Sequence, residues 1–316
     1  MARETALEGK LVVLIGGSGF LGKYVAQALL ERGARLRIAS RNPRAAWPLR
    51  PLANLGQLQF VHCDVSKPAS VAAAMLGADA AAYLVGAFKG DLDELHAKAA
   101  GRAAALAASE GLDAFAYVSA LGADAQSDIG YANSKAKGER LVLEAFPNAT
   151  ILRPSVLFGE DDEFVNRFAG LIASLPALPV FGAGAKLQPL HAYDAAEALA
   201  NALSYPRHHG GQTYEIAGPE VITMMELNQR IAVSQNRQRL LFPVPEGIET
   251  IFATLPGTPI TRDQLALLRA GNVAGGTLPG ISELGVTPKP LAVFLDRWMT
   301  RFRKNGRFGT KIKAVR

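Results

Sequence analysis

The chain has almost no cysteine and no long apolar run. Cys63 is the one cysteine among 316 residues, so no disulfide can form within the chain, and we expect Cys63 to pack in the core. No segment approaches the roughly 20 consecutive apolar residues of a membrane-spanning helix. Residues 1–8 lack the basic and apolar regions of a secretory signal and are too short for an organelle presequence. These absences predict a globular protein of a reducing, cytoplasmic compartment.

Acidic residues are absent from residues 297–316, which contain eight lysines or arginines. The whole chain has 34 basic and 28 acidic side chains, so its positive charge is concentrated in this tail. We expect no nucleic-acid partner, because no recognition fold accompanies the tail. Trp298, Met299, Phe302 and Phe308 lie among the charges. Three interpretations remain open: contact with an anionic membrane surface, contact with an acidic protein, and a solvated terminus.

A glycine-rich turn follows the first apolar segment of the chain. Residues 11–15 form a continuous apolar run, typical of a buried parallel strand, and residues 24–31 follow helical periodicity. The glycines between them allow a tight turn, close approach of a pyrophosphate, and close packing of the next helix on its sheet. The turn therefore predicts a dinucleotide site formed by Gly16, Gly17, Ser18, Gly19, Phe20, Leu21 and Gly22.

The second predicted strand, residues 35–39, lacks an acidic residue at its end. An NAD-specific site usually has Asp or Glu there to accept hydrogen bonds from the adenosine ribose. Ser40, Arg41 and Arg44 instead offer a hydroxyl and guanidinium groups, which suit a 2′-phosphate. We predict NADPH (NADP+) as the cofactor, with NADH as the less favoured alternative.

Apolar runs alternate with helical stretches, which is typical of repeated βαβ units. The pattern predicts an α/β fold, a Rossmann-like doubly wound parallel sheet with a small, mainly helical C-terminal cap. Expected strands are 11–15, 35–39, 57–62, 80–85, 114–119 and 150–153, and expected helices are 68–76, 92–109 and 131–145. Farther along we expect a loop at 175–184, a strand at 187–190, and helices at 192–203, 224–233, 246–255 and 261–269.

Three regions are predicted from this organisation. Residues 1–218 would form the NADP(H)-binding Rossmann domain, with a loop insertion at about 156–186 that contributes to the cap. Residues 219–296 would form the cap itself, and residues 297–316 the basic tail. Because ligands of open α/β sheets lie beyond the carboxyl ends of the strands, a substrate would sit between sheet and cap.

Tyr131 and Lys135 are four residues apart in a predicted helix and therefore share one helix face. An ammonium group beside a phenol favours the phenolate and should lower the tyrosine pKa toward the range useful for proton transfer in hydride chemistry. The same spacing also occurs on ordinary amphipathic helices. Its place after the fifth predicted strand of a nucleotide-binding sheet favours a catalytic pair.

With the glycine-rich turn and the Tyr131–Lys135 pair together, the chain resembles the short-chain dehydrogenase/reductase superfamily, in its extended or atypical branch. The resemblance implies that Asp64 contacts adenine, that Gly86 lies beside the cofactor, and that Tyr131 and Lys135 act as acid and ribose clamp. Matching segments also place Val65, Val85, Ser119, Pro154 and Ser155 at the cofactor. No metal is expected.

Longer segments resemble a narrower family, subunit 9 of the complex I alpha subcomplex. They are residues 117–124, 151–160, 188–194 and 255–264. The resemblance implies a tightly bound, structural NADPH in an accessory subunit of respiratory NADH:ubiquinone oxidoreductase, with complex I subunits as partners. The chain would then lie peripherally on the inner face of a bacterial inner membrane, or on the matrix side in a eukaryote.

One departure from the enzyme pattern supports a structural role. Active members of the superfamily place Ser or Thr one or two residues beyond Ser119 to hold the substrate carbonyl, and here those residues are Ala120 and Leu121. Ser119 could replace them only after a backbone shift. A missing donor of this kind costs about 2–4 kcal/mol of transition-state stabilisation. We therefore expect slow turnover, and keep as the alternative an NADPH-dependent short-chain reductase or epimerase acting on a small molecule.

Overall fold

The computed structural model describes residues 6–245, 247, 249, 262–304 and 306. The chain divides into two compact units. The first comprises Met1–Pro154, Ala192–Ile216 and Gly275–Thr287, and the second comprises Ser155–His191, Ala217–Ala274 and Pro288–Arg316. Each unit has a hydrophobic core of its own.

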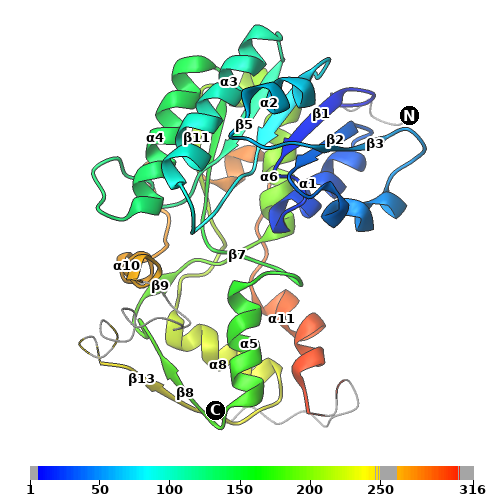
Figure 1. The fold of residues 1–316 in the computed structure, drawn as a ribbon. Coiled ribbons are helices and arrows are strands. Elements are labelled where there is room, and N and C mark those ends of the chain that lie inside the picture. Colours follow the sequence, from blue (N-terminus) through cyan, green and yellow to red (C-terminus); the bar gives the residue numbers. More distant parts are fainter. Residues whose placement is uncertain (1–5, 246, 248, 250–261, 305, 307–316) are drawn as a thin grey trace. The chain divides into compact units, whose positions relative to one another are not determined.

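A seven-stranded parallel sheet forms the centre of the first unit (Figure 1). The strand order is β11-β6-β5-β4-β1-β2-β3. The bounds are β1 Leu11–Ile15, β2 Arg35–Ser40, β3 Leu58–His62, β4 Ala80–Tyr83, β5 Ala114–Val118, β6 Thr150–Pro154 and β11 Thr213–Ile216. The order reverses between β1 and β4, and doubly wound sheets bind ligands at such a switch point, beyond the carboxyl ends of the strands.

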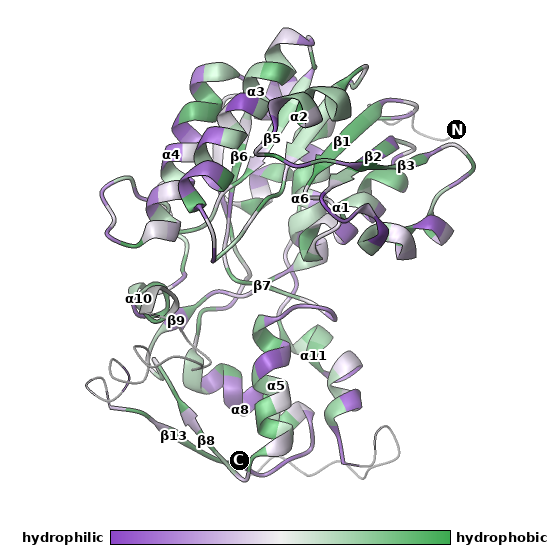
Figure 2. Ribbon diagram, in the orientation of Figure 1, coloured by the Kyte–Doolittle hydropathy of each residue, from purple (hydrophilic) through white to green (hydrophobic). Residues whose placement is uncertain are grey.

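Helices cover both faces of this sheet (Figure 1). On one face α1 (Phe20–Leu30) packs with α6 (Ala192–Ser204), and on the other lie α2 (Pro68–Met75), α3 (Ala99–Ser109) and α4 (Gly130–Ala145). Figure 2 shows hydrophobic residues gathered in the strands between them. Helix α3 is alanine-rich, and its small buried side chains allow it to pack closely on α4 and the sheet.

Shorter helical segments complete the first unit. They are the 3-10 helix η1 (Pro43–Leu52), the π-helix η2 (Asp93–Lys98) directly before α3, α7 (Pro206–His209), and η3 (Ile281–Leu284). The predicted fold class and the six predicted strands are confirmed, with ends that differ by at most two residues. The sequence pattern does not predict β11, because its four residues alternate between buried and partly exposed and offer no continuous apolar run.

In its described residues, the second unit combines helices with three two-stranded ladders. The helices are α5 (Phe164–Ser174), α8 (Met224–Ser234), α10 (Arg262–Ala270), α11 (Ala292–Met299) and the short η4 (Thr300–Phe302). The ladders pair β7 (Leu157–Phe158) with β10 (Leu190–His191), β9 (Lys186–Leu187) with β12 (Ile222–Thr223), and β8 (Ala177–Val180) with β13 (Leu240–Pro243). Within the described ranges, we find no helix with the length and apolarity needed to cross a membrane.

Two local predictions in the second unit are wrong. The segment expected as a loop, 175–184, contains strand β8, which accommodates Pro179 because a strand in a two-stranded ladder has one unpaired edge. The single strand expected at 187–190 is divided into β9 and β10, which have different partners, and Pro189 without an N–H group lies between them. The helix expected at 246–255 lies mostly outside the described residues.

The start of the basic tail belongs to the core of the second unit. Trp298 and Met299 are buried there beside Phe294, and Phe302 packs against the same cluster. Of the three interpretations of the tail, contact with lipid does not apply to Trp298 and Met299, because α11 turns their side chains into the core. Residues 305 and 307–316, including Phe308, lie outside the described part of the chain.

Candidate cofactor-binding and active site

The turn after β1 requires glycine at several positions. Gly16 has φ +83°, a conformation that favours glycine, and its N–H donates to the Ala39 carbonyl at 2.8 Å. A Cβ on Gly17 would lie 2.7 Å from Leu14 Cβ, and a Cβ on Gly22 would lie 2.5 Å from the Gly17 carbonyl oxygen. The three glycines thus allow the tight turn and bring α1 directly against it.

The N-terminus of α1 is open toward this turn. Gly19 is the N-cap residue and has no side chain to bond the first N–H groups, and no acidic residue lies in the first turn of the helix. Free N–H groups and the positive end of the helix dipole together suit a phosphate. Ser18, Phe20 and Leu21 are partly exposed around this end.

The end of β2 is rich in hydrogen-bond donors. Ser40 is buried, and its hydroxyl has no hydrogen-bond partner within the described structure, which fits a group that a bound ligand completes. Arg41 and Arg44 are exposed beside it, and the Arg44 guanidinium lies 5.5 Å from the Trp47 ring centroid. This end of β2 therefore offers a hydroxyl and two guanidinium groups to a bound nucleotide.

Asp64 follows β3 and carries a negative charge at the same edge of the sheet. Its carboxylate accepts hydrogen bonds from the Ser66 hydroxyl at 2.8 Å and the Ser66 N–H at 3.1 Å. These bonds, and to a smaller extent the nearby Arg41 charge, lower the pKa of Asp64. Val65 beside it is buried. Asp64 is therefore an ionised acceptor, as expected of a group that meets an adenine amino group.

Val85 brings the end of β4 to the glycine-rich turn. The Leu84 N–H donates to the Ile15 carbonyl at 2.9 Å, and a Cβ on Gly16 would lie 3.2 Å from the Val85 side chain. Gly86 follows, and a Cβ at this position would meet no atom within 4 Å. The predicted cofactor residues after β1 and β4 thus meet at the switch point of the sheet.

Lys135 reaches the same switch point from α4. Its side chain is 2 % exposed, and its Nζ donates to the carbonyls of Val85 at 3.1 Å and Val118 at 2.8 Å. An ammonium group has three donors, so one remains for a cofactor ribose. Burial lowers the pKa of Lys135 to about 7, although the Glu139 charge opposes the shift.

Tyr131 lies beside Lys135, with its ring centroid 6.0 Å from Nζ. Burial raises the pKa of Tyr131 to about 12. The expectation that the lysine lowers this pKa is therefore wrong in this structure, because desolvation of the phenol outweighs a neighbouring amine whose own pKa is depressed. When bound, a nicotinamide cofactor would supply a hydride here, and the phenol would be the adjacent proton donor.

Two aromatic side chains that the sequence reasoning missed enclose Tyr131. Phe88, which is 56 % exposed, stacks on the Tyr131 ring with centroids 4.6 Å apart. His96 is fully buried and meets the edge of the same ring at 5.3 Å. The π-helix η2 positions His96, and such irregular turns are often found at functional sites.

His96 connects the cofactor loop to the turn that carries Tyr131. Its Nε2 accepts from the Ala87 N–H at 3.0 Å, so the ring proton lies on Nδ1, which donates to the Ser134 hydroxyl at 2.9 Å. That hydroxyl in turn donates to the Tyr131 carbonyl at 2.9 Å. Burial, with the Lys135 charge, lowers the pKa of His96 to about 3, so this link is neutral.

The Ser119 hydroxyl is committed to a buried ion pair. It donates to Glu139, whose carboxylate also receives the Arg153 guanidinium through two bonds of 2.8 and 2.7 Å. Ser119 and Glu139 are 2 % and 7 % exposed. Ala120 and Leu121 follow without a hydroxyl. In this arrangement the side chains directly after β5 stabilise the fold, and none of them has a free donor for a substrate carbonyl.

The last two predicted cofactor residues fall in different units. Pro154 ends β6 in the first unit, and its carbonyl accepts from the Leu121 N–H at 3.0 Å. Ser155 begins the second unit, is buried, and donates its hydroxyl to the Gln188 carbonyl at 2.7 Å. The structure gives both residues structural contacts. Their contact with a cofactor stays a prediction, as does that of the other predicted site residues.

Comparison with known proteins places this geometry in a family. Residues 16–169 match the NAD(P)H-binding family model, and residues 124–274 match the RmlD substrate binding domain. NADH dehydrogenase [ubiquinone] 1 alpha subcomplex subunit 9 of Rattus norvegicus is 31 % identical over 301 residues, which cover 91 % of this chain and 79 % of that protein. The chain belongs to this subunit 9 family.

One further relative and one solved structure with the same fold carry the names of enzymes. A ceramide reductase of Caulobacter vibrioides is 31 % identical over 192 residues, which cover 60 % of this chain and 59 % of that protein. The crystal structure of Citrobacter sp. triphenylmethane reductase complexed with NADP(H) superimposes with a TM-score of 0.73 and 22 % identity, over 92 % of this chain and 99 % of that one. This structural likeness shows that they share a fold.

Proposed function

We propose that this subunit 9 chain is an NADPH-binding accessory subunit of respiratory complex I, in which the nucleotide is held tightly and is not turned over quickly. Its bound NADPH would stabilise the first unit by mass action, since a ligand that binds only the folded state raises its stability. The role is therefore structural, with the cofactor as a permanent component.

The observation that carries this proposal is the Ser119–Glu139–Arg153 network. It engages the Ser119 hydroxyl, which could hold a substrate carbonyl only after a backbone shift, while the glycine-rich turn, Ser40 and the remaining Lys135 donor stay available for a nucleotide. The Ser40 hydroxyl has no hydrogen-bond partner among the described residues, whereas the Ser119 hydroxyl is already bonded to Glu139. Such a site suits retention of a cofactor. The name and coverage of the relatives support complex I as the place of attachment.

We propose NADPH rather than NADH because of the residues at the end of β2. Ser40 and Arg41 would bond the 2′-phosphate, and Arg44 would lie beside it. No acidic residue stands between Glu31 and Asp64 to repel this group or to bond a ribose in its place.

We propose that the chain lies peripherally on the inner face of a bacterial inner membrane, or on the matrix side in a eukaryote. The residues after Arg303 would contribute basic charge to the attachment, through protein or anionic lipid. Arg301 and Arg303 themselves already bond other groups of the second unit, including the Asn166 and Asp296 side chains. The proposal therefore confines the attaching part of the tail to residues 304–316.

The proposed function is tested by purifying the protein from its native membranes on a native gel. We expect it to migrate with complex I and to oxidise NADPH no faster than a Tyr131→Phe variant. Migration as a free oligomer, together with steady substrate-dependent NADPH oxidation, would overturn the proposal.

A second candidate function is an NADPH-dependent short-chain reductase or epimerase. The specific observation in its favour is the retained pair Tyr131 and Lys135, with Lys135 directed at the switch point of the sheet. Tyr131 would donate the proton and Lys135 would orient the ribose. Turnover that depends on a small substrate and is lost in Tyr131→Phe would favour this function.

A further inference from the structure

The sheet of the first unit has an open edge at β3. The Leu36 N–H donates to the Gln57 carbonyl and the Cys63 N–H donates to the Ser40 carbonyl, so the odd-numbered residues of this segment face β2. Alternate residues of a parallel strand bond to opposite sides. The N–H and C=O groups of Leu58, Phe60 and His62 therefore point to the open side, where no strand of the described residues pairs with them.

The segment that contains β2, η1 and β3 is rich in arginine and has no acidic residue. Between Glu31 and Asp64 the chain has six arginines, no lysine and no acidic residue. Arg32 pairs with Glu197, and Arg37 is bonded to Gln59 and to the carbonyls of Ala74 and Leu76. The other four are Arg35, Arg41, Arg44 and Arg50. Arg41 and Arg44 belong to the proposed phosphate site of the cofactor, and the Arg41 charge also acts on Asp64. Arg50 lies beside β3 and forms no ion pair with any described residue.

Apolar side chains complete the surface between η1 and β3. Trp47, Leu52 and Leu55 are 44 %, 51 % and 107 % exposed. The Arg50 guanidinium lies 4.7 Å from the Trp47 ring centroid and 5.4 Å from the Phe60 ring centroid. These contacts hold a cation and two rings together in a region that solvent reaches.

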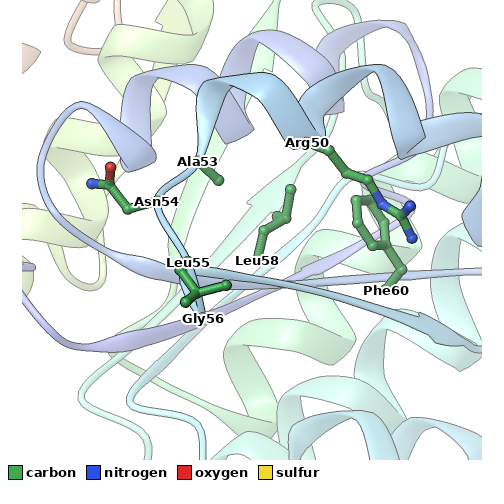
Figure 3. A pocket seen from close by; sticks show the side chains of 7 residues that line it. All are labelled: Arg50, Ala53, Asn54, Leu55, Gly56, Leu58 and Phe60. Carbon is green, nitrogen blue, oxygen red and sulfur yellow. The ribbon is translucent and has the colours of Figure 1, made fainter.

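A pocket of about 350 Å³ opens beside Arg50. Figure 3 shows Arg50 extending from η1 toward Phe60, with Leu58 at the centre of the pocket and Leu55 at the opposite end. Its lining is Arg50, Ala53, Asn54, Leu55, Gly56, Leu58 and Phe60. A partner side chain that enters this pocket would be anchored next to the open strand.

We propose that this β3–η1 surface docks an extended, acidic segment of a partner protein, which adds a strand along β3. Three features of the surface match such a segment: unpaired backbone groups that accept a strand, the Arg50 guanidinium without an acidic partner among the described residues, and a pocket for one side chain. A lipid surface fits less well, because hydrocarbon cannot satisfy the edge N–H and C=O groups. The inference rests on the proposed function, in which the partner is a subunit of complex I.

A photo-cross-linking amino acid tests the surface in the full chain within its native cells. Leu55→p-benzoylphenylalanine places the probe at the pocket, and Leu76→p-benzoylphenylalanine, at a 67 % exposed position after α2, is the matched control. We expect position 55, but not 76, to give an adduct with an acidic segment of a complex I subunit. An adduct with a second copy of this chain, with lipid, or with nothing while the chain migrates with complex I would overturn the inference.

Charge reversal gives an independent readout. Arg50→Glu should weaken association with complex I by about tenfold, because it places like charges together at the interface. Arg207→Glu makes the same charge change at an exposed position of the first unit and should leave association unchanged. Equal association of both variants with the wild type would refute the docking surface. Failure of the wild-type chain itself to migrate with complex I would refute the proposed function instead.

Discussion

The two halves of the candidate site use their polar groups differently. At the nucleotide end, the Ser40 hydroxyl and the first N–H groups of α1 have no side-chain partners among the described residues. At the reaction end, Ser119 is bonded to Glu139, and Tyr131 is covered by Phe88 and His96. Groups without partners suit a ligand that stays, whereas committed groups stabilise the fold. This difference suits the proposed role, in which the chain would hold a nucleotide without fast turnover.

The largest effect on the free energy of unfolding is expected at Glu139, whose ion pair stabilises the reaction end of the site. Glu139→Gln removes the charge that Arg153 and Ser119 share, and should lower the free energy of unfolding by about 3 kcal/mol, because it leaves a partly buried guanidinium unpaired. Glu144→Gln breaks the exposed Arg140 pair on the same helix and should cost less than about 1 kcal/mol. Urea unfolding measures both. Equal losses would contradict a structural role for the reaction end.

The next largest effect on stability is expected from a methyl group added at Gly22, in contrast to one added at a glycine outside the glycine-rich turn. Gly22→Ala brings a methyl group against the Gly17 carbonyl and should destabilise the first unit by about 1–3 kcal/mol, with loss of bound nucleotide. Gly170→Ala, in α5 with open space around it, should be neutral or stabilising by up to about 1 kcal/mol. Thermal unfolding and nucleotide retention are the readouts. A Gly22→Ala protein that behaves like Gly170→Ala would show that the turn tolerates a side chain.

His96 allows a test by pH. His96→Gln removes one or both of the hydrogen bonds that His96 makes with Ala87 and Ser134. The loss should lower the free energy of unfolding by about 1–2 kcal/mol at pH 7. The pKa of His96 is about 3 in the folded protein, against 6.5 ordinarily, so the unfolded chain binds a proton that the folded chain rejects.

The contribution of His96 to the free energy of unfolding of the wild type therefore falls as the pH drops from 6.5 toward 3, by at most about 1.4 kcal/mol per pH unit. The glutamine variant lacks this slope, so the difference between wild type and variant should shrink in acid. Unfolding curves at several pH values measure it. A difference that stays constant would show that His96 is not a buried neutral link.

At the nucleotide end, Arg41→Glu should weaken NADPH binding by about tenfold or more and NADH binding much less, since a charged bond to the 2′-phosphate is lost. Arg35→Glu, at the other end of β2, serves as the control. Calorimetric titration with both nucleotides checks the difference. Equal losses for NADPH and NADH in Arg41→Glu would remove the argument for the phosphorylated cofactor.

The smallest effect on stability is expected from the tail. Deletion of residues 304–316 should leave thermal unfolding unchanged while weakening association with complex I or the membrane in a salt-sensitive way. Trp298 and Met299 are kept, because both are buried in the second unit. Unchanged association at low and high salt would exclude the tail from attachment.

The sequence predicted the parts of the site that depend on local backbone requirements. Gly16 with its positive φ and Gly22 against Gly17 follow from the spacing of glycines after an apolar strand, and the chain order of strands places them at the switch point. Short elements such as β11 escaped because a four-residue strand that alternates in burial has little periodicity to detect.

Contacts between distant segments were not predictable from the pattern. His96 bonds to Ala87 and Ser134, which lie in other segments of the chain. These bonds form because His96 lies in the π-helix η2, which packs against α4. The commitment of Ser119 to Glu139 depends on how α4 lies against β5. The sign of the Tyr131 pKa shift was mistaken for the same reason, since burial is a property of the folded whole.

In the proposed role, the chain retains a phosphorylated nicotinamide nucleotide as a structural component. The most direct measurement is chromatography of the nucleotide released from protein purified with complex I, combined with its exchange against labelled NADPH. We expect about one NADPH per chain, because the proposal assigns the chain a single nucleotide site. The bound NADPH should exchange with labelled NADPH far more slowly than complex I turns over, as expected of a ligand that stabilises the folded state. Recovery of NADH, of no nucleotide, or of NADP+ that cycles during turnover would contradict the account.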